Sequence, residues 1–246
     1  MFNPHAQGIR HSRTFERDGP HVAGLDKAAI IAPRKIWQGQ CETGESKKLD
    51  GDNKIIFARD VLNSSERISY IQESSAQEKP PATIGGEHNK LEYTRNGKPY
   101  EFSPYPHKTV SFMPHIERMG RRILEKIQEI ECTEHDLMDS ATEYEYGIGR
   151  VDGGTIEKKN DSAGAWRHVA FYAVGQTRYL RITKDGARGY INVPLHDNTL
   201  VICTGSTFNK NYFHQVDSLP ADHHTGTSLL LKCRFRKPLL SGTKTI

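Results

Sequence analysis

Long apolar runs, cysteine pairs and a leader-like segment are all missing from this chain of 246 residues. No run approaches the roughly 20 apolar residues of a membrane-spanning helix. The segment 1–21 is polar and lacks the apolar stretch of a secretory signal. We therefore expect no membrane partner and an intracellular location, in the cytoplasm or the nucleus.

Cysteine is scarce, and its spacing excludes two classes of small domain. The four cysteines form no C-x-x-C pair; they are Cys41, Cys132, Cys203 and Cys233. Scattered cysteines argue against a zinc knuckle and give no disulfide framework. We expect mostly buried thiols in a reducing compartment.

Composition sets the broad class but leaves the partner open. Hydrophobic residues make up 35% and charged residues 26% of the chain, and the mean hydropathy is −0.67. This is polar, but apolar segments recur in the C-terminal half, so the chain is not of the disordered type. The net charge of +4 suits a nucleic-acid surface and equally suits proteins with no such partner.

The pattern along the chain divides it into three parts. Residues 1–54 are polar and form a predicted N-terminal arm, residues 55–240 a domain, and residues 241–246 a tail. Polar arms are ordered when they lie on their own domain or on a neighbour. We therefore expect self-association through the arm as the main partnership of this chain.

Two helices are predicted near the start of the domain, after a strand at Ile55–Phe57. Asn63 or Ser64 can cap the first helix. The second begins at Pro114 and has apolar residues at helical spacing, namely Ile116, Met119, Ile123, Ile127 and Ile130. Its other face carries Arg118, Arg121, Arg122 and Lys126, which we interpret as a solvated face in preference to a nucleic-acid patch.

Strands dominate the remainder. Asn96-Gly97 lies between alternating residues and predicts a hairpin. Seven strand-like segments follow from Tyr144 onward, separated by turn signals, and this arrangement predicts a barrel or sandwich. The fold class is therefore α+β and mostly β.

Several segments, in this order, resemble the AlkB family of iron- and 2-oxoglutarate-dependent dioxygenases. They are the "YxFSPYP…FMP" entry into the second helix, "RHVAFYAVGQTRYLRI" with its Gly175-x-x-Arg178, the "NYFHQV" around His214, and a closing "CRFR" that ends at Arg236. The match runs from about Ile55 to Pro238. It implies a double-stranded β-helix, or jelly-roll, core with N-terminal helices.

The resemblance also implies where a metal site would lie. The family holds iron with a His-x-Asp pair and a distal His, a triad that leaves positions open for cosubstrate and dioxygen. Asp161 takes the Asp position and His214 the distal position, but Lys159 stands where the first His should be. No H-x-D occurs in the chain. An ammonium has no lone pair for a metal, so we interpret Lys159, Asp161 and His214 as the positions of a vestigial site.

The cosubstrate positions depart from the family as well. The "N-x-Y" of the preceding strand falls on Ile148 and Arg150, and the Arg that would bind the distal carboxylate of 2-oxoglutarate falls on Leu230. Arg236 is the one position of the family's cosubstrate-binding residues at which this chain keeps the expected arginine. A buried dicarboxylate without an opposing cation is costly. We therefore expect no catalytic residues, no metal and no cofactor.

The other candidate site residues have structural interpretations. We expect Arg178, Arg181, Arg234 and Arg236 to be outward strand positions, with a basic face as the alternative. His115-x-Glu117 at the start of the second helix is a formal H-x-E, but a satisfied or solvent-facing His is the expectation there.

These residues predict a catalytically inactive AlkB-like domain that serves assembly or binding, such as a structural protein of a virus. One alternative is an active iron- and 2-oxoglutarate-dependent nucleic-acid demethylase, which requires Fe(II), 2-oxoglutarate and a different register around Lys159. The other alternative is nucleic-acid binding without chemistry.

Overall fold

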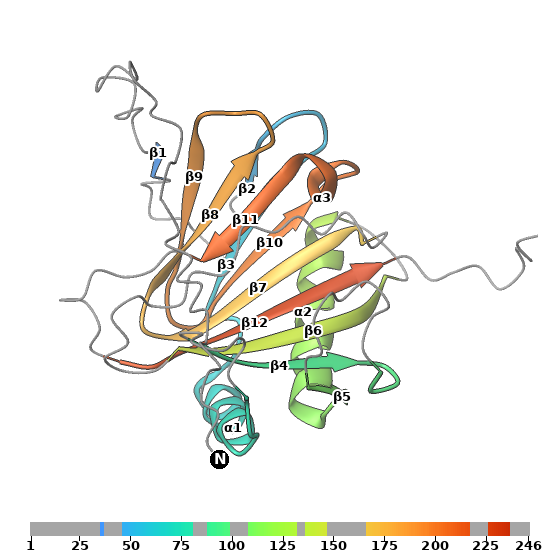
Figure 1. Cartoon of the computed structure of the whole chain (residues 1–246), viewed down its shortest axis with the longest axis vertical. Helices are drawn as coiled ribbons and strands as arrows, with labels where there is room; N and C mark the ends of the chain where they lie inside the picture. Colours follow the sequence, from blue (N-terminus) through green and yellow to red (C-terminus); the bar gives the residue numbers. More distant parts are fainter. Residues whose placement is uncertain are drawn as a thin grey trace, which may run out of the picture. The chain divides into compact units, whose positions relative to one another are not determined.

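The structure is a computed structural model, and it describes residues 35–36, 46–80, 88–98, 108–131, 136–146, 166–216 and 226–236. The chain divides into two compact units, residues 1–32 and 33–246. The first unit lies outside the described residues. The second contains two β-sheets that face each other, with two helices on the far side of the larger sheet (Figure 1).

The larger sheet has eight strands in the order β2-β3-β10-β7-β12-β6-β4-β5. Its strands are β2 (Ser46–Lys48), β3 (Lys54–Arg59), β10 (Thr199–Thr204), β7 (His168–Gly175), β12 (Ser228–Arg236), β6 (Leu137–Tyr146), β4 (His88–Thr94) and β5 (Thr109–Ser111). The smaller sheet has four strands in the order β1-β9-β8-β11. These are β1 (Lys35–Ile36), β9 (Tyr190–Leu195), β8 (Arg178–Lys184) and β11 (Tyr212–Val216).

The central strands of the larger sheet are buried on both faces, which explains their nearly continuous apolar sequences. Alternate residues of β7 face opposite ways. Ala170 and Tyr172 join the core under the helices, whereas Val169 and Phe171 join the core between the sheets. A strand covered on both sides has no need of polar alternation.

Two helices cover the outer face of the larger sheet. Helix α1 (Ser64–Ser75) starts with a capping box, in which Asn63 accepts from the backbone N–H of Glu66 and the Glu66 carboxylate accepts from the Asn63 N–H. Helix α2 (Pro114–Glu131) packs with its apolar stripe on the sheet. The prediction for this stripe is confirmed at Ile116, Met119, Ile123 and Ile127, all buried; the side chain of Ile130 lies outside the described residues.

Gly175 ends β7 and makes the turn into β8. Its φ is +93°, and a Cβ there would collide with the carbonyl oxygen of Thr227. The glycine of the "AVGQTR" segment is therefore required by a close backbone contact.

Two details differ from the expectations, and a third is described only in part. Strand β6 begins at Leu137, earlier than the segment expected from Tyr144. The turn at Asn96-Gly97 is present, with Gly97 at φ +67°, but the described partners of β4 are β6 and β5. The second arm of the expected hairpin falls in residues 99–107, outside the described residues. The short helix α3 (Phe208–Asn211) was not expected.

Two short strands lie inside the segment predicted as an arm. β2 pairs with β3 in the larger sheet, and β1 pairs in parallel with β9 in the smaller sheet. The domain boundary at residue 54 stays a prediction.

Cys203 and Cys233 are buried free thiols; the other two cysteines lie outside the described residues. Among the helices that the structure describes, none has the length and apolarity to cross a membrane.

Candidate functional site: the space between the sheets

Alternation along the strands directs one set of side chains into the space between the two sheets. His214 comes from β11, Lys232 and Arg234 from β12, and Arg178 from β8. All four residues are at least nine-tenths buried. This space therefore holds several ionisable groups, although most of its lining is apolar.

His214 and Lys232 form the central contact. The Nζ of Lys232 lies 2.7 Å from Nε2 of His214. The His214 ring also packs edge-on against Phe171, with 5.2 Å between ring centroids, and the Lys232 ammonium lies 5.9 Å from the centroid of the same ring. With Nε2 unprotonated, the ammonium donates a charge-assisted hydrogen bond to it.

These residues do not fit the iron that the resemblance implies. A metal ion bound by imidazole contacts the lone pair of the nitrogen directly, at about 2.0–2.1 Å in the case of zinc. An ammonium that contacts Nε2 uses the lone pair of that nitrogen and adds a positive charge at the same point. Within the described residues, no three or more His, Cys, Asp or Glu side chains gather where they could hold a metal.

Two cosubstrate positions predicted from the sequence are described. Leu230 is 2% exposed and packs in the core between the sheets, so the position expected to lack its Arg is an apolar core position. Arg236 donates from Nε to Oδ1 of Asp139 at 2.8 Å. Asp139 also accepts from the indole N–H of Trp166 at 2.8 Å.

The remaining predicted positions, Ile148, Arg150, Lys159 and Asp161, lie outside the described residues. Strand β6, which precedes them, ends at Tyr146. Tyr144 and Tyr146 belong to the core between the sheets, and the Arg178 guanidinium lies 4.0 Å from the centroid of the Tyr146 ring. Burial lowers the pKa of Arg178.

The four strand arginines do not form one basic face. Arg178 and Arg234 are buried and point inward, so the expectation of outward positions was wrong for both. Arg234 donates to the hydroxyl oxygens of Ser140 and Thr142. Arg181 is partly exposed and lies on the outer face of β8.

The basic face of α2 is largely neutralised. Arg118 pairs with Glu73, Arg122 pairs with Glu66 and Glu125, and Lys126 pairs with Glu129. These ion pairs support its interpretation as a solvated face.

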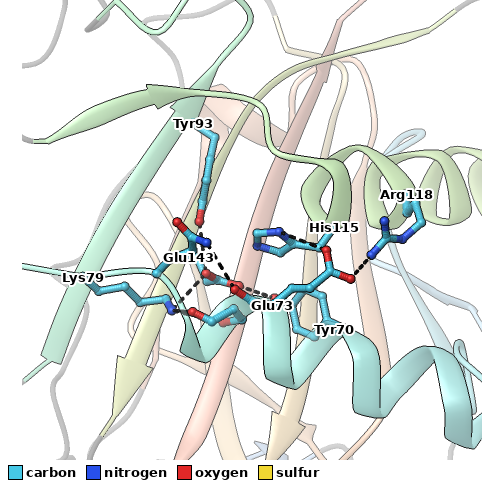
Figure 2. Close-up of polar contacts among 9 residues, drawn as sticks. Tyr70, Glu73, Lys79, Tyr93, His115, Arg118 and Glu143 are labelled. Carbon is cyan, nitrogen blue, oxygen red and sulfur yellow. Dashed lines mark hydrogen bonds and ion pairs between the residues drawn. The ribbon is translucent and has the colours of Figure 1, made fainter.

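A second cluster of buried charges lies under α1, on the other side of the larger sheet (Figure 2). The carboxylate of Glu143 accepts from the hydroxyls of Tyr70 and Tyr93, at 2.7 and 3.3 Å, and lies 3.3 Å from the ammonium of Lys79. Burial raises the pKa of both tyrosines. His115 sits against the two tyrosine rings.

His115 is neither solvent-facing nor fully satisfied, contrary to the expectation. It is 3% exposed. Its Nδ1 lies 3.9 Å from a carboxylate oxygen of Glu73, and its Nε2 has no hydrogen bond in the structure. Burial lowers the pKa of His115. The residue lines a cleft of about 520 Å³ between α1 and α2.

A third buried cluster joins Asp136, His168 and Thr204. Nε2 of His168 lies 2.8 Å from Asp136, and Nδ1 lies 2.7 Å from the Thr204 hydroxyl. The order carboxylate–imidazole–hydroxyl is that of a nucleophile and its base, but all three residues are at most 2% exposed. The cluster therefore ties β7 to β10 and to the start of β6.

The sequence did not reveal Lys232 or Arg234 as residues of the space between the two sheets. The one signal for Lys232 was its place in an otherwise apolar strand, between Leu231 and Cys233. A lysine in a central strand has to be buried, and a buried ammonium requires an acceptor.

The fold is that of the AlkB-like oxygenases. A solved structure titled "The structure of OsALKBH1" superposes with a TM-score of 0.56 at 14% identity, over 76% of this chain and 100% of that chain. An oxidoreductase of the 2OG-Fe(II) oxygenase family from Burkholderia pseudomallei superposes with a TM-score of 0.52 at 12% identity, over 74% of this chain and 84% of that chain. The jelly-roll prediction is confirmed by this similarity, which establishes the fold alone. No family model matches the sequence, and no curated protein matches it.

Proposed function

We propose that this chain is an AlkB-like domain without oxygenase chemistry, which acts as a binding or assembly protein. The observation that carries the proposal is the 2.7 Å contact between Lys232 and His214. It removes the described imidazole that the family pattern assigns to iron. The family pattern assigns another imidazole to the position that Lys159 takes by prediction, and a lysine there supplies no imidazole.

The cosubstrate positions support the same conclusion. Arg236 is paired with Asp139, and Leu230 contributes only apolar surface between the sheets. A 2-oxo dicarboxylate bound there would have to displace Asp139 from the half-exposed guanidinium of Arg236. It would also meet the apolar side chain of Leu230. Neither change is favourable without a metal to anchor the ligand.

The assembly part of the proposal comes from the N-terminal arm. β1, inside the predicted arm, adds to the edge of the smaller sheet beside β9. Sheet edges present unpaired backbone groups and accept a further strand from the same or another chain. An arm that pairs in this way can link copies of a rigid block, as in a structural protein of a virus.

Calorimetry tests the loss of chemistry. Chelator-stripped protein is titrated with Co(II) in the presence of 2-oxoglutarate, and in parallel is incubated with Fe(II), 2-oxoglutarate and a methylated oligonucleotide. We expect no one-to-one metal binding and no succinate above background. Tight metal binding that disappears in Asp161→Ala and His214→Ala would overturn the proposal and establish the demethylase alternative.

A further inference from the structure

We propose that the cleft between α1 and α2 binds a small amphipathic anion, a molecule with one carboxylate or sulfonate group on an apolar body. The cleft has a volume of about 520 Å³, which is within the range of small-molecule sites. It lies among the helices on the outer face of the larger sheet, so that sheet separates it from His214 and Lys232. The inference therefore goes beyond the proposed function and concerns a different site.

One stripe of each helix lines the cleft. The stripe on the side of α1 runs from Leu62, just before the helix, to Glu73, and the stripe on α2 runs from His115 to Glu125. The lining residues of each stripe recur three or four positions apart, which places them on one face of the helix. Two helical faces therefore form the opposite walls of the cleft.

Two ion pairs connect these walls and bracket the middle of the cleft. Glu73 of α1 pairs with Arg118 of α2 (Figure 2), and Glu66 pairs with Arg122 at 2.7 Å. Glu66 and Glu73 are two helical turns apart, roughly 10 Å along α1. The pairs engage the charged groups toward both ends, so the part of the cleft between them is where a ligand binds.

The middle of the cleft has an apolar floor. Tyr70 of α1 and Met119 of α2 line it and are 3% and 2% exposed. The Tyr70 hydroxyl donates to Glu143 in the buried cluster under α1, so the ring is what the tyrosine presents to a ligand. An apolar body in this position is stabilised by burial against the aromatic ring and the thioether side chain.

The rim of the middle part carries one positive charge that has no counterion. Ser69 and Arg121 line the cleft there, and Arg121 is exposed. Carboxylates engage Arg118 and Arg122, whereas Arg121 has no ion pair or hydrogen bond among the residues that the structure describes. A guanidinium presents coplanar N–H donors that match two oxygens of a carboxylate or sulfonate, and the serine hydroxyl adds a donor. This rim therefore selects an anionic head group.

The remaining charges favour one negative group over several. Glu125 is engaged by Arg122, and His115 is neutral at pH 7 because burial lowers its pKa below 6.5. One anionic group pairs with Arg121, whereas a second group in the cleft would meet the carboxylates of Glu66 and Glu73. This arrangement favours a monoanion with an apolar body and disfavours polyanions.

The experiment titrates the full chain with the dye anilinonaphthalene sulfonate, which has one sulfonate on an apolar ring system, and follows its fluorescence. We expect one saturable site. Arg121→Gln should weaken binding about tenfold, because a charge-assisted hydrogen bond is lost. Ser69→Phe should abolish binding, because the ring fills the middle of the cleft. Lys126→Gln is the matched control: it removes a charge of α2 that pairs with Glu129 outside the cleft lining, and it should leave binding unchanged.

A second titration uses the neutral dye phenylnaphthylamine, which has the same rings without the sulfonate and should bind about tenfold more weakly. Three results would overturn the inference: no saturable binding of the sulfonate dye, equal weakening by Arg121→Gln and Lys126→Gln, or equal affinity for the two dyes. A thermal melt of each variant shows whether it is folded, and Arg121→Gln decides the outcome if Ser69→Phe is not. None of these results affects the metal titration, so this inference can fail while the proposed loss of oxygenase chemistry stands.

Discussion

The ammonium nitrogen of Lys232 lies 2.7 Å from Nε2 of His214, between the two sheets of an oxygenase fold. This contact predicts that repair of the first metal position alone is insufficient. We expect Lys159→His to bind no Co(II), because Lys232 still occupies the imidazole nitrogen. The double variant Lys159→His/Lys232→Ala should bind one Co(II), measured by calorimetry and by the visible absorption of the bound ion.

The control for that experiment adds Asp161→Ala to the double variant and should abolish binding. Lys232→Gln serves as the second route if the alanine variant does not fold, and a thermal melt decides which of the two is used. Binding of Co(II) by Lys159→His alone would show that Lys232 is not the obstacle.

The buried ion pair of Glu143 and Lys79 under α1 should contribute most of the stability of the contact between α1 and the larger sheet. Glu143→Gln leaves the Lys79 ammonium buried without its carboxylate, a change that costs about 3–5 kcal/mol. Glu145→Gln is the matched control, because Glu145 lies 3.9 Å from the same ammonium and is 36% exposed; its loss should cost less than about 1 kcal/mol. Urea unfolding of the two variants gives both values, and equal costs would contradict the assigned importance of Glu143.

The buried His115 predicts that the free energy of unfolding depends on pH. Burial lowers the pKa of His115 below its ordinary value of 6.5, so the unfolded chain binds a proton there before the folded chain does. The free energy of unfolding should therefore fall as the pH drops below about 6.5. His115→Phe keeps an aromatic ring and removes the titration, so its stability should fall less between pH 7 and pH 5. Parallel curves for the two proteins in urea unfolding would rule out this role.

The predicted arm should determine the oligomeric state. Deletion of residues 1–40 removes β1, the strand of the arm that pairs with β9, and leaves β2 in place. We expect a smaller particle by light scattering, because copies linked through the arm would separate. A control deletion of the predicted tail, residues 241–246, should leave the particle size unchanged, and an unchanged size in both would contradict assembly through the arm.

The positions of the helices and most strands followed from local patterns in the sequence. Asn63 and Glu66 form a capping box within three residues, and α2 has an apolar stripe whose spacing matches one helical face. Strand β6 was recognised only in part. Its segment "LMDSATEYEY" has few of the β-branched and aromatic residues that mark strands, and neighbours on both sides hold it in the sheet.

The sequence by itself determined the order of the elements, the AlkB-like fold and the absence of an H-x-D pair, because each depends on residues close together in the chain. Only the tertiary structure decided what His214 contacts. Lys232 is 18 residues away on a strand of the other sheet, and no local pattern specifies which side chains meet between two sheets.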